Sequence, residues 1–268
     1  MDRKKLGRQT VRFASPPSIA GFGNAVGQKE RDGPLGPYFD LAGEDDTFSQ
    51  PSWEKAETAM QKQALAFALE RAGITADQLD YVFAGDLLNQ CIATSYSLRA
   101  QNAPFFGLYG ACSTMAESLC LAGMFVDTGL ARQCLAVTSS HFCSAERQFR
   151  FPLEYGGQRT PTAQWTVTGS GACVVGQNGQ PPFVRAVTVG TVADLGITDI
   201  NNMGAAMAPA AAQTLCQYFA DTGHKPEDFD LILTGDLGFV GSRLLERLMQ
   251  AEGYPMAKLH NDCGLMIY

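Results

Sequence analysis

The chain has 268 residues, and 20 Lys and Arg against 27 Asp and Glu give it a formal net charge of −7. A composition that is 46% hydrophobic and 18% charged excludes a disordered chain and suits one large domain or two small ones. The acidic balance argues against a nucleic-acid binder, because neutralising phosphate groups requires a basic surface.

Neither a metal site nor a membrane span is predicted. The eight cysteines contain no C-x-x-C pair, and most stand in apolar runs typical of small buried residues. The N-terminus lacks the apolar segment of a secretory signal, and no apolar run reaches the about 18 residues that a transmembrane helix needs. We therefore expect an intracellular protein in a reducing compartment, with no metal site and no resident cofactor.

The first clear elements are a helix that begins after Ser52 and a strand at 81–84. Ser52 is a favourable N-cap, and Met60 and Ala64 recur on one face of the helix. Gly73 is typical of a helix end. The short apolar run at 81–84 is typical of a buried strand.

A strand, a tight turn and a helix surround Cys112. Residues 104–109 predict the strand and residues 112–125 the helix. A thiol at a helix N-terminus has its pKa lowered by the helix dipole, and the backbone N–H groups of Cys112, Ser113 and Thr114 would attract an anion. The alternative is a small cysteine that packs in a crowded turn.

The next strand, at 134–138, ends in the polar residues Ser139, Ser140 and His141. Ligands of open α/β sheets gather beyond the carboxyl ends of the strands, so these side chains are candidate ligand contacts. The competing interpretation is an ordinary polar loop.

Three arginines follow this strand in a loop with mixed charges, namely Arg147, Arg150 and Arg159. Each guanidinium can clamp a carboxylate, although surface ion pairs are the more frequent role of such residues. The small residues at 166–175 predict a strand that another chain or a ligand can approach closely.

A repeat at an offset of 150 residues links the two parts of the chain. Residues 64–87 match residues 214–237 at six identical positions, where chance gives about one or two. Both copies predict a helix, a glycine stop, a polar turn and a strand, which indicates duplicated αβ halves. Two unrelated αβ units with a common layout are the alternative.

The repeat also predicts an incomplete second half. After the first copy, 126 residues precede the second copy, whereas only 31 residues follow the second copy. The last residues, 265–268, predict the start of a strand, so we expect a C-terminally truncated chain.

Long strings spread over most of the chain resemble the stage V sporulation protein AD family, which has a thiolase-like fold. The strings are GPLG (33–36), AGDLLNQ (84–90), GACSTMAES (110–118), TSSH (138–141), AERQFRFPLEYGGQ (145–158), TVTGSGA (166–172), DLGITD (194–199), MGAAMAPAAA (203–212), FDLILTGDLG (229–238) and HNDCGLMIY (260–268). The resemblance implies an α/β class, a thiolase-like layered αβαβα fold of two duplicated halves. Residues 1–180 would form the N-terminal half and residues 181–268 a partial C-terminal half.

The resemblance also implies a role in spores. Family members resemble soluble components of the machinery that moves dipicolinic acid into the forespore, and they bind dipicolinic acid or its calcium complex. Calcium would then enter only as part of the ligand. The implied place is the forespore or spore, peripheral to the inner membrane, with other stage V sporulation A proteins as partners. A homodimer through an edge strand is also implied, and residues 168–171 are the candidate strand.

Cys112 matches the position of the thiolase nucleophile. Thiolase relatives that condense acyl groups also need a histidine of the second half, near residues 234–236, where this sequence has none. His224 precedes that strand, and His260 lies well beyond it. The chain therefore resembles a catalytically degenerate scaffold that binds a ligand. The alternatives are an active thiolase- or ketoacyl-synthase-type acyltransferase that uses Cys112, and a scaffold fragment that binds nothing.

Dipicolinate is a flat aromatic dianion, which N–H groups, hydroxyls, a histidine and an arginine can hold. The residues that we predict to bind it are Cys112, Ser113, Thr114, Ser139, Ser140, His141 and Arg147.

Overall fold

The computed structural model describes residues 4–149, 160, 162–177, 179–199 and 201–268. The chain forms two compact units. The first, here called the sheet unit, contains Ser15–Gly156 and Thr166–Arg185. The second, here called the helix-pair unit, contains Met1–Ala14, Gly157–Trp165 and Ala186–Tyr268. Both ends of the chain therefore belong to the helix-pair unit.

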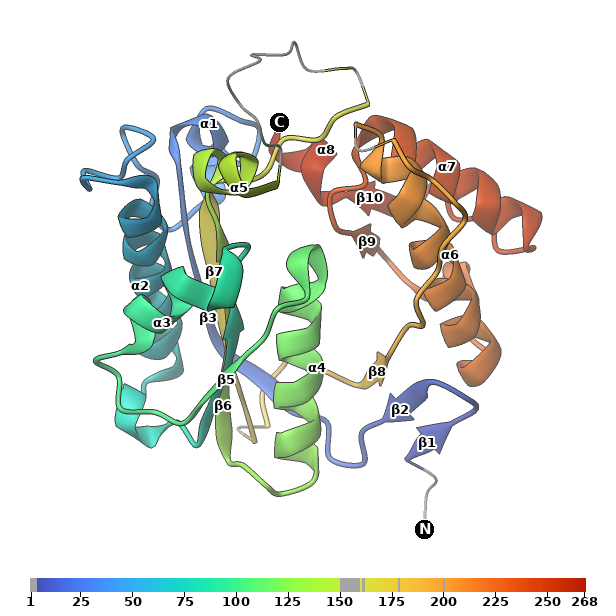
Figure 1. The fold of residues 1–268 in the computed structure, drawn as a ribbon. Helices are drawn as coiled ribbons and strands as arrows, with labels where there is room; N and C mark the ends of the chain where they lie inside the picture. Colours follow the sequence, from blue (N-terminus) through green and yellow to red (C-terminus); the bar gives the residue numbers. More distant parts are fainter. Residues whose placement is uncertain (1–3, 150–159, 161, 178, 200) are drawn as a thin grey trace. The chain divides into compact units, whose positions relative to one another are not determined.

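A mixed five-stranded sheet in the order β3-β7-β6-β4-β5 is the centre of the sheet unit (Figure 1). Its strands are β3 (Ser18–Val26), β4 (Tyr81–Gly85), β5 (Phe105–Gly107), β6 (Gln133–Ser140) and β7 (Gly169–Gly176). β4 pairs in parallel with β5 and β6, whereas β7 is antiparallel to both of its neighbours, β3 and β6. The edge strands are thus β3 and β5. The prediction that residues 168–171 offer an edge to a second copy is wrong, because β7 is hydrogen-bonded on both sides within the chain.

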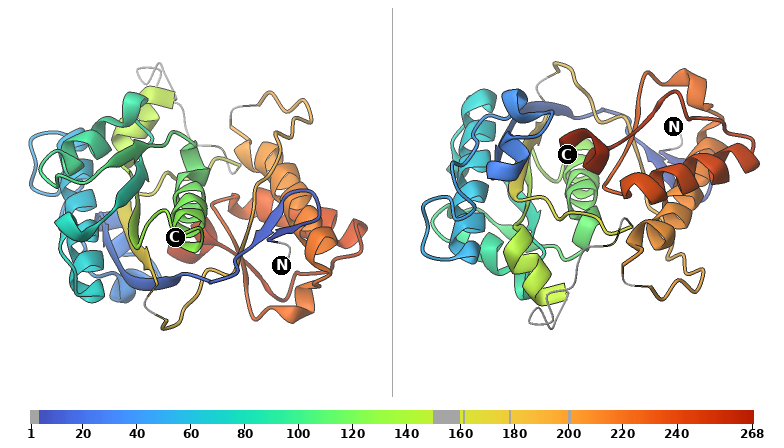
Figure 2. Two further views of the ribbon diagram at one scale, coloured as in Figure 1. Left: turned by 90° about the horizontal axis from the view of Figure 1, so that it is seen from below. Right: turned by 90° about the horizontal axis from the view of Figure 1, so that it is seen from above.

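Helices cover both faces of this sheet, with α2 and α3 on one face and α4 on the other (Figures 1 and 2). The helices of the unit are α1 (Gln28–Arg31), α2 (Trp53–Ala72), α3 (Ile92–Leu98), α4 (Thr114–Asp127) and α5 (Phe142–Phe149). Short 3₁₀ turns at Asn89–Cys91 and Ala111–Ser113 lead into α3 and α4.

Two glycines of β3 allow α2 to pack closely on the sheet. A Cβ atom at Gly21 would lie 2.3 Å from the carbonyl oxygen of Ala68, and one at Gly23 would lie 2.5 Å from that of Ala64. A side chain at either position would push α2 off the sheet and open a cavity in the core below it.

On the opposite face, α4 packs through Ala122 and Val126 against Phe83, Cys134 and Val175, all of them buried. The apolar positions of α4 recur at helical spacing, and those of β4 and β6 form continuous runs. This pattern is typical of strands that helices cover on both faces.

The helix-pair unit is built around α6 (Met203–Thr222) and α7 (Gly238–Ala251), which meet at Gly204 and Gly241. Leu245, Met249 and Met256 form the buried centre of this pair. Its short strands are β1 (Lys5–Leu6), β2 (Thr10–Arg12), β8 (Ala186–Thr188), β9 (Ile232–Thr234) and β10 (His260–Asp262). The order is β1-β2-β8 in an antiparallel sheet, and β9 pairs in parallel with β10. No helix among the described residues is both long and apolar enough to cross a membrane.

Asp221, near the end of α6, ties the N-terminal strands to this unit. Its carboxylate accepts hydrogen bonds from the backbone N–H groups of Arg8, Gln9 and Thr10, at 2.8 to 2.9 Å. Burial alone would raise the pKa of Asp221, but these bonds outweigh it and hold the pKa well below its usual value. Residues 8–10 are therefore held by a side chain more than 200 positions away in the sequence.

Both copies of the repeat have the predicted local structure. α2 and α6 each span 20 residues at the same offset, and each ends at a left-handed glycine, Gly73 (φ 67°) and Gly223 (φ 76°). A 3₁₀ turn and a strand follow in both copies, and each strand has a parallel neighbour that comes later in the chain, β5 for β4 and β10 for β9. The duplication itself stays a prediction.

The end of the chain differs from the prediction. Residues 265–268 were expected to start a strand, whereas Cys263–Ile267 form a short helix, α8. The side chain of Asp262 caps this helix by accepting from the N–H of Leu265 at 3.1 Å. A four-residue apolar run has no period of its own, so the cap decides its structure.

Candidate functional site

Parallel pairing brings the carboxyl ends of β4, β5 and β6 to one edge of the sheet. β5 leads into the turn that carries Cys112, and β6 ends at Ser139 and Ser140 with His141 directly after it. β4 lies between them, so the two segments start about 10 Å apart at the usual strand spacing. This edge is where an open α/β sheet binds its ligands.

Cys112 lies in the 3₁₀ turn before α4, not in the first turn of the helix, and it is exposed. Ala111 before it has a left-handed backbone with φ 48°. Ser113 Oγ donates to the carbonyl oxygen of Gly110 at 2.7 Å, and Thr114 Oγ1 donates to that of Ala111 at 2.8 Å. The two hydroxyls therefore stabilise the turn, and Cys112 stands exposed between Ala111 and Ser113.

An acidic side chain also stands at this turn. A Cβ atom at Gly110 would lie 2.6 Å from Glu117 Oε2, so this carboxylate sits over the turn. Its charge offsets the attraction of the α4 N-terminus for an anion. The turn therefore suits a ligand whose negative charge is neutralised, for example by a bound cation, better than a free dianion.

The end of β6 divides its hydroxyls between the two faces of the sheet. Ser139 is buried, where its Oγ donates to Glu57 Oε1 at 2.9 Å and accepts from Gln61 Nε2 at 3.2 Å. Both partners belong to α2. Successive strand residues point to opposite faces, so Ser140 belongs to the α4 face, the face that carries the Cys112 turn. Ser140 Oγ donates to the carbonyl oxygen of Val167 at 2.6 Å.

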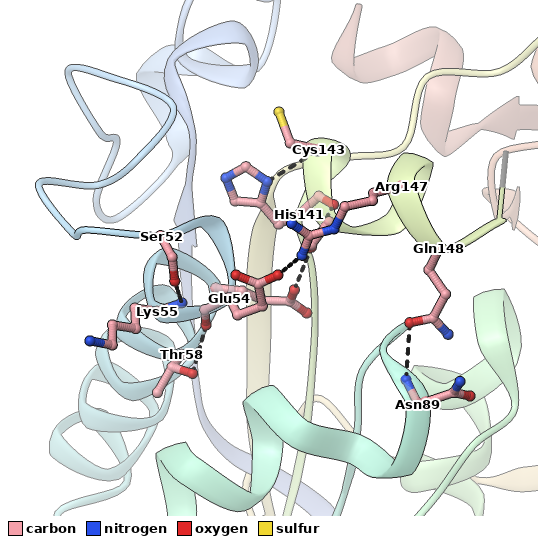
Figure 3. A network of polar contacts seen from close by, with 11 residues as sticks. Ser52, Glu54, Lys55, Thr58, Asn89, His141, Cys143, Arg147 and Gln148 are labelled. Carbon is pink, nitrogen blue, oxygen red and sulfur yellow. Dashed lines mark hydrogen bonds and ion pairs between the residues drawn. The ribbon is translucent and has the colours of Figure 1, made fainter. Parts of the chain in front are cut away.

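His141 is buried and forms a hydrogen bond through each of its ring nitrogens, one of them to Cys143 (Figure 3). Its Nδ1 accepts from the backbone N–H of Cys143 at 3.2 Å, which leaves Nε2 to donate to the carbonyl oxygen of Asp46 at 2.6 Å. Its ring stacks on Trp53 at a centroid distance of 6.4 Å. Burial lowers the pKa of His141, so the ring is neutral at neutral pH.

Arg147 of α5 forms an ion pair with Glu54 of α2, and its guanidinium lies 5.6 Å from the centre of the Trp53 ring (Figure 3). The other arginines predicted to clamp a carboxylate, Arg150 and Arg159, lie outside the described residues.

The predicted ligand residues therefore form two groups. Cys112, Ser113, Thr114 and Ser140 lie at the α4 face of the sheet edge. The other three residues instead bond to α2 or to the segment before it. Ser139 bonds to Glu57 and Arg147 pairs with Glu54, both of α2, and His141 bonds to Asp46 in the segment before α2. A ligand that contacts the second group must break these bonds.

A buried polar network behind Ser139 was not predicted. Glu57 and Gln61 stand on the buried face of α2, and Gln61 Nε2 donates to Thr94 Oγ1 at 3.1 Å. Thr94 Oγ1 in turn donates to Asp86 Oδ2 at 2.6 Å, and Ser97 Oγ donates to Gln61 Oε1. The sequence carried one sign of this network. Glu57 and Gln61 lie one turn apart on the same face of the helix as the apolar residues Met60 and Ala64.

Burial raises the pKa of Glu57 to about 7, and the nearby carboxylate of Asp86 adds to this rise. Hydrogen bonds from Ser139 and from Ser144 Oγ, at 3.2 Å, oppose it. Glu57 is therefore the group of this network that changes its charge near neutral pH.

The second unit places a histidine where the sequence showed none. β10 pairs with β9 in parallel, and this brings His260 Nε2 to 3.0 Å from Thr234 Oγ1. Thr234 Oγ1 also lies 3.3 Å from Asp262 Oδ2, and Glu246 Oε1 lies 3.5 Å from His260 Nδ1. The side chain of His260 is buried, so this cluster holds the strand pair together in the structure.

The chain matches one protein family over nearly its whole length. The family model of stage V sporulation protein AD (SpoVAD) matches residues 7–268. Stage V sporulation protein AD of Bacillus subtilis (strain 168) is 48% identical over 265 residues, which cover 99% of this chain and 78% of that protein.

Solved structures of lower identity share the fold. The 3-oxoacyl-[acyl-carrier-protein] synthase III of Aquifex aeolicus VF5 aligns with a TM-score of 0.57 at 19% identity, over 92% of this chain and 83% of that one. Cerulenin-bound OleA of Xanthomonas campestris aligns with a TM-score of 0.62 at 15% identity, over 95% and 84%. At such identities the likeness concerns the fold alone, which is thiolase-like.

Proposed function

Because this chain belongs to the stage V sporulation protein AD family, we propose that it binds dipicolinic acid as a component of the machinery that takes this compound up into the forespore. The observation that carries the proposal is the match to the family over nearly the whole chain. The scaffold is thiolase-like, and the proposal assigns it to binding rather than to catalysis.

The Cys112 turn and Ser140 support a ligand site at the α4 face of the sheet edge. Cys112 is exposed there, and backbone N–H groups at the start of α4 can donate hydrogen bonds to a carboxylate. Glu117 beside the turn disfavours the free dianion, whereas the calcium complex of dipicolinate carries no net charge. We therefore propose that the calcium complex is the preferred form of the ligand. Calcium enters with the ligand, and no resident metal is proposed.

Equilibrium dialysis with dipicolinate, with and without calcium, tests the proposal. Cys112→Ala and Ser140→Ala should weaken binding by about tenfold, if each removes one direct contact. Cys120→Ala, on the same helix as the site but half-buried, is the matched control and should leave binding unchanged. Unchanged affinity in both site variants would show that the ligand does not bind at this edge of the sheet.

One observation favours a second candidate function, acyl transfer by Cys112. Cys112 is exposed in the turn that leads into α4, where an acyl group can reach its thiol. An acyl-coenzyme A hydrolysis and condensation assay distinguishes the two functions. Acyl transfer that disappears in Cys112→Ala would favour the enzyme, and its absence together with dipicolinate binding would favour the binding scaffold. A chain that shows neither activity would be a non-binding scaffold.

For the partners, we propose other stage V sporulation A proteins at the inner membrane of the forespore, and a second copy of this chain. The edge strand β5 is the better candidate for self-association, since β7 is interior. Phe105 and Phe106 of this strand are 37% and 44% exposed, which is unusual for neighbouring aromatic residues of a sheet.

A further inference from the structure

A groove of about 720 Å³ lies between α2 and α3 in the sheet unit. One wall carries Lys55 and Lys62 of α2, and the other carries Ile92 and Tyr96 of α3 together with Arg99, its C-cap residue. The proposed ligand site uses none of these residues.

Two lysines of the lining are set well apart along α2. Lys55 and Lys62 are two helical turns apart on one face of α2, a separation of about 10 Å. Ile92, Tyr96 and Arg99 follow one another at spacings of four and three residues, so they form a matching stripe along α3.

Polar contacts join the two helices beside the groove. Thr58 Oγ1 donates to the carbonyl oxygen of Ala93 at 3.4 Å, and Gln61, one turn later, bonds to Thr94 and Ser97. Gln61 precedes Lys62, and Ser97 stands two residues before Arg99, so Lys62 lies nearer to Arg99 than Lys55 does.

The charges of the groove are unbalanced. Lys55, Lys62 and Arg99 form no ion pair with any carboxylate in the described part of the chain. The one acidic residue of the lining, Glu54, is paired with Arg147. The groove is thus a positive site on a protein whose formal net charge is −7.

Apolar surface lies between these cations. Ile92 is 45% exposed and Tyr96 is 52% exposed, and the guanidinium of Arg99 lies 5.5 Å from the centre of the Tyr96 ring. Exposed aromatic and arginine side chains together are typical of the residues that dominate protein interfaces.

We propose that this groove docks an acidic segment of a partner protein. An apolar side chain of the segment packs between Ile92 and Tyr96, and its carboxylates pair with Lys62 and Arg99 at one end and with Lys55 at the other. The separation of Lys55 and Lys62 favours a peptide segment, because a small dianion cannot reach two cations about 10 Å apart. The concave shape of the groove argues against a membrane as the partner, since a flat bilayer contacts convex surfaces.

A fluorescent peptide tests the proposal by anisotropy. The probe is an amphipathic peptide of about 14 residues with Leu on one helix face and Glu elsewhere. A second peptide replaces every Glu by Lys, and vesicles of phosphatidylglycerol form a third arm. We expect the acidic peptide to bind, with an affinity that falls as salt rises, and the other two probes to fail.

The variant Lys62→Glu with Arg99→Glu should weaken binding of the acidic peptide by at least about tenfold, and Tyr96→Ser should weaken it about fivefold without a change in charge. Arg247→Glu with Lys258→Glu changes the net charge by the same amount in the other unit and should leave binding unchanged. No binding of the acidic peptide, equal affinity in the charge-reversed groove, or binding of the vesicles alone would overturn the proposal.

Discussion

Replacing Glu57 by Gln should remove a pH dependence from the stability of the sheet unit. The carboxyl group of Glu57 is fully buried and accepts from Ser139 and Ser144, and no cation takes part in the hydrogen bonds described around it. Burial and the carboxylate of Asp86 raise its pKa to about 7 from an ordinary value of 4.5.

The sign follows from proton linkage. Because the pKa is higher in the folded state, the folded protein keeps a proton that the unfolded chain has lost between pH of about 4.5 and 7. The free energy of unfolding therefore falls as the pH rises through this range. The full loss is about 3 kcal/mol, and about 1 kcal/mol of it falls between pH of about 6 and 8.

Urea unfolding at these two pH values measures the effect. Trp53 stands at the start of α2, against His141, and Trp165→Phe would leave it as the single tryptophan reporter of the sheet unit. In this background, the protein with Glu57 should lose about 1 kcal/mol more of its free energy of unfolding than the Glu57→Gln variant as the pH rises. His141 titrates in both proteins, so its contribution cancels in the difference.

Glu70→Gln is the matched control, since Glu70 is an exposed residue of the same helix. It should keep the pH dependence of the wild-type protein. An equal loss of stability in Glu57→Gln and in the wild-type protein would refute the assignment of the proton to Glu57.

Three further outcomes are expected. Asp221→Ala should raise the rates of hydrogen exchange at the N–H groups of residues 8–10 by about tenfold, because they lose their acceptor, and unchanged rates would show that other contacts hold them. Phe105→Lys should convert a self-associating chain to a monomer in light scattering, and a dimer that persists would move the interface away from β5. Iodoacetamide should modify exposed Cys112 at least about a hundredfold faster than Cys134, whose pKa burial raises to about 12, and equal rates by mass spectrometry would contradict this.

Neighbouring residues in the sequence predicted the helices whose capping residues mark where they begin and end. The helix after Ser52 begins where the N-cap predicts, with Ser52 Oγ accepting from the N–H of Lys55 at 3.4 Å. Gly73 and Gly223 end their helices in the left-handed conformation that favours glycine. These features depend on neighbouring residues, so a sequence reveals them.

The roles of the candidate site residues depend on distant partners, which a sequence does not reveal. Ser139 meets Glu57 across 82 positions, and His141 meets Asp46 across 95 positions. His260 looked remote from Thr234 in the sequence, and only the parallel pairing of β9 and β10 brings them together. The order of the strands is likewise a non-local property, and this is why β7 was mistaken for an edge.

The central claim is that the chain binds dipicolinate at the sheet edge of its first unit. Isothermal titration calorimetry of the wild-type chain with dipicolinate and calcium tests it most directly. Isophthalate, which has the same two carboxylates but no ring nitrogen, is the matched control ligand. We predict saturable binding of about one dipicolinate per chain, strengthened by calcium, with much weaker binding of isophthalate. No saturable heat with dipicolinate, either with or without calcium, would contradict the account.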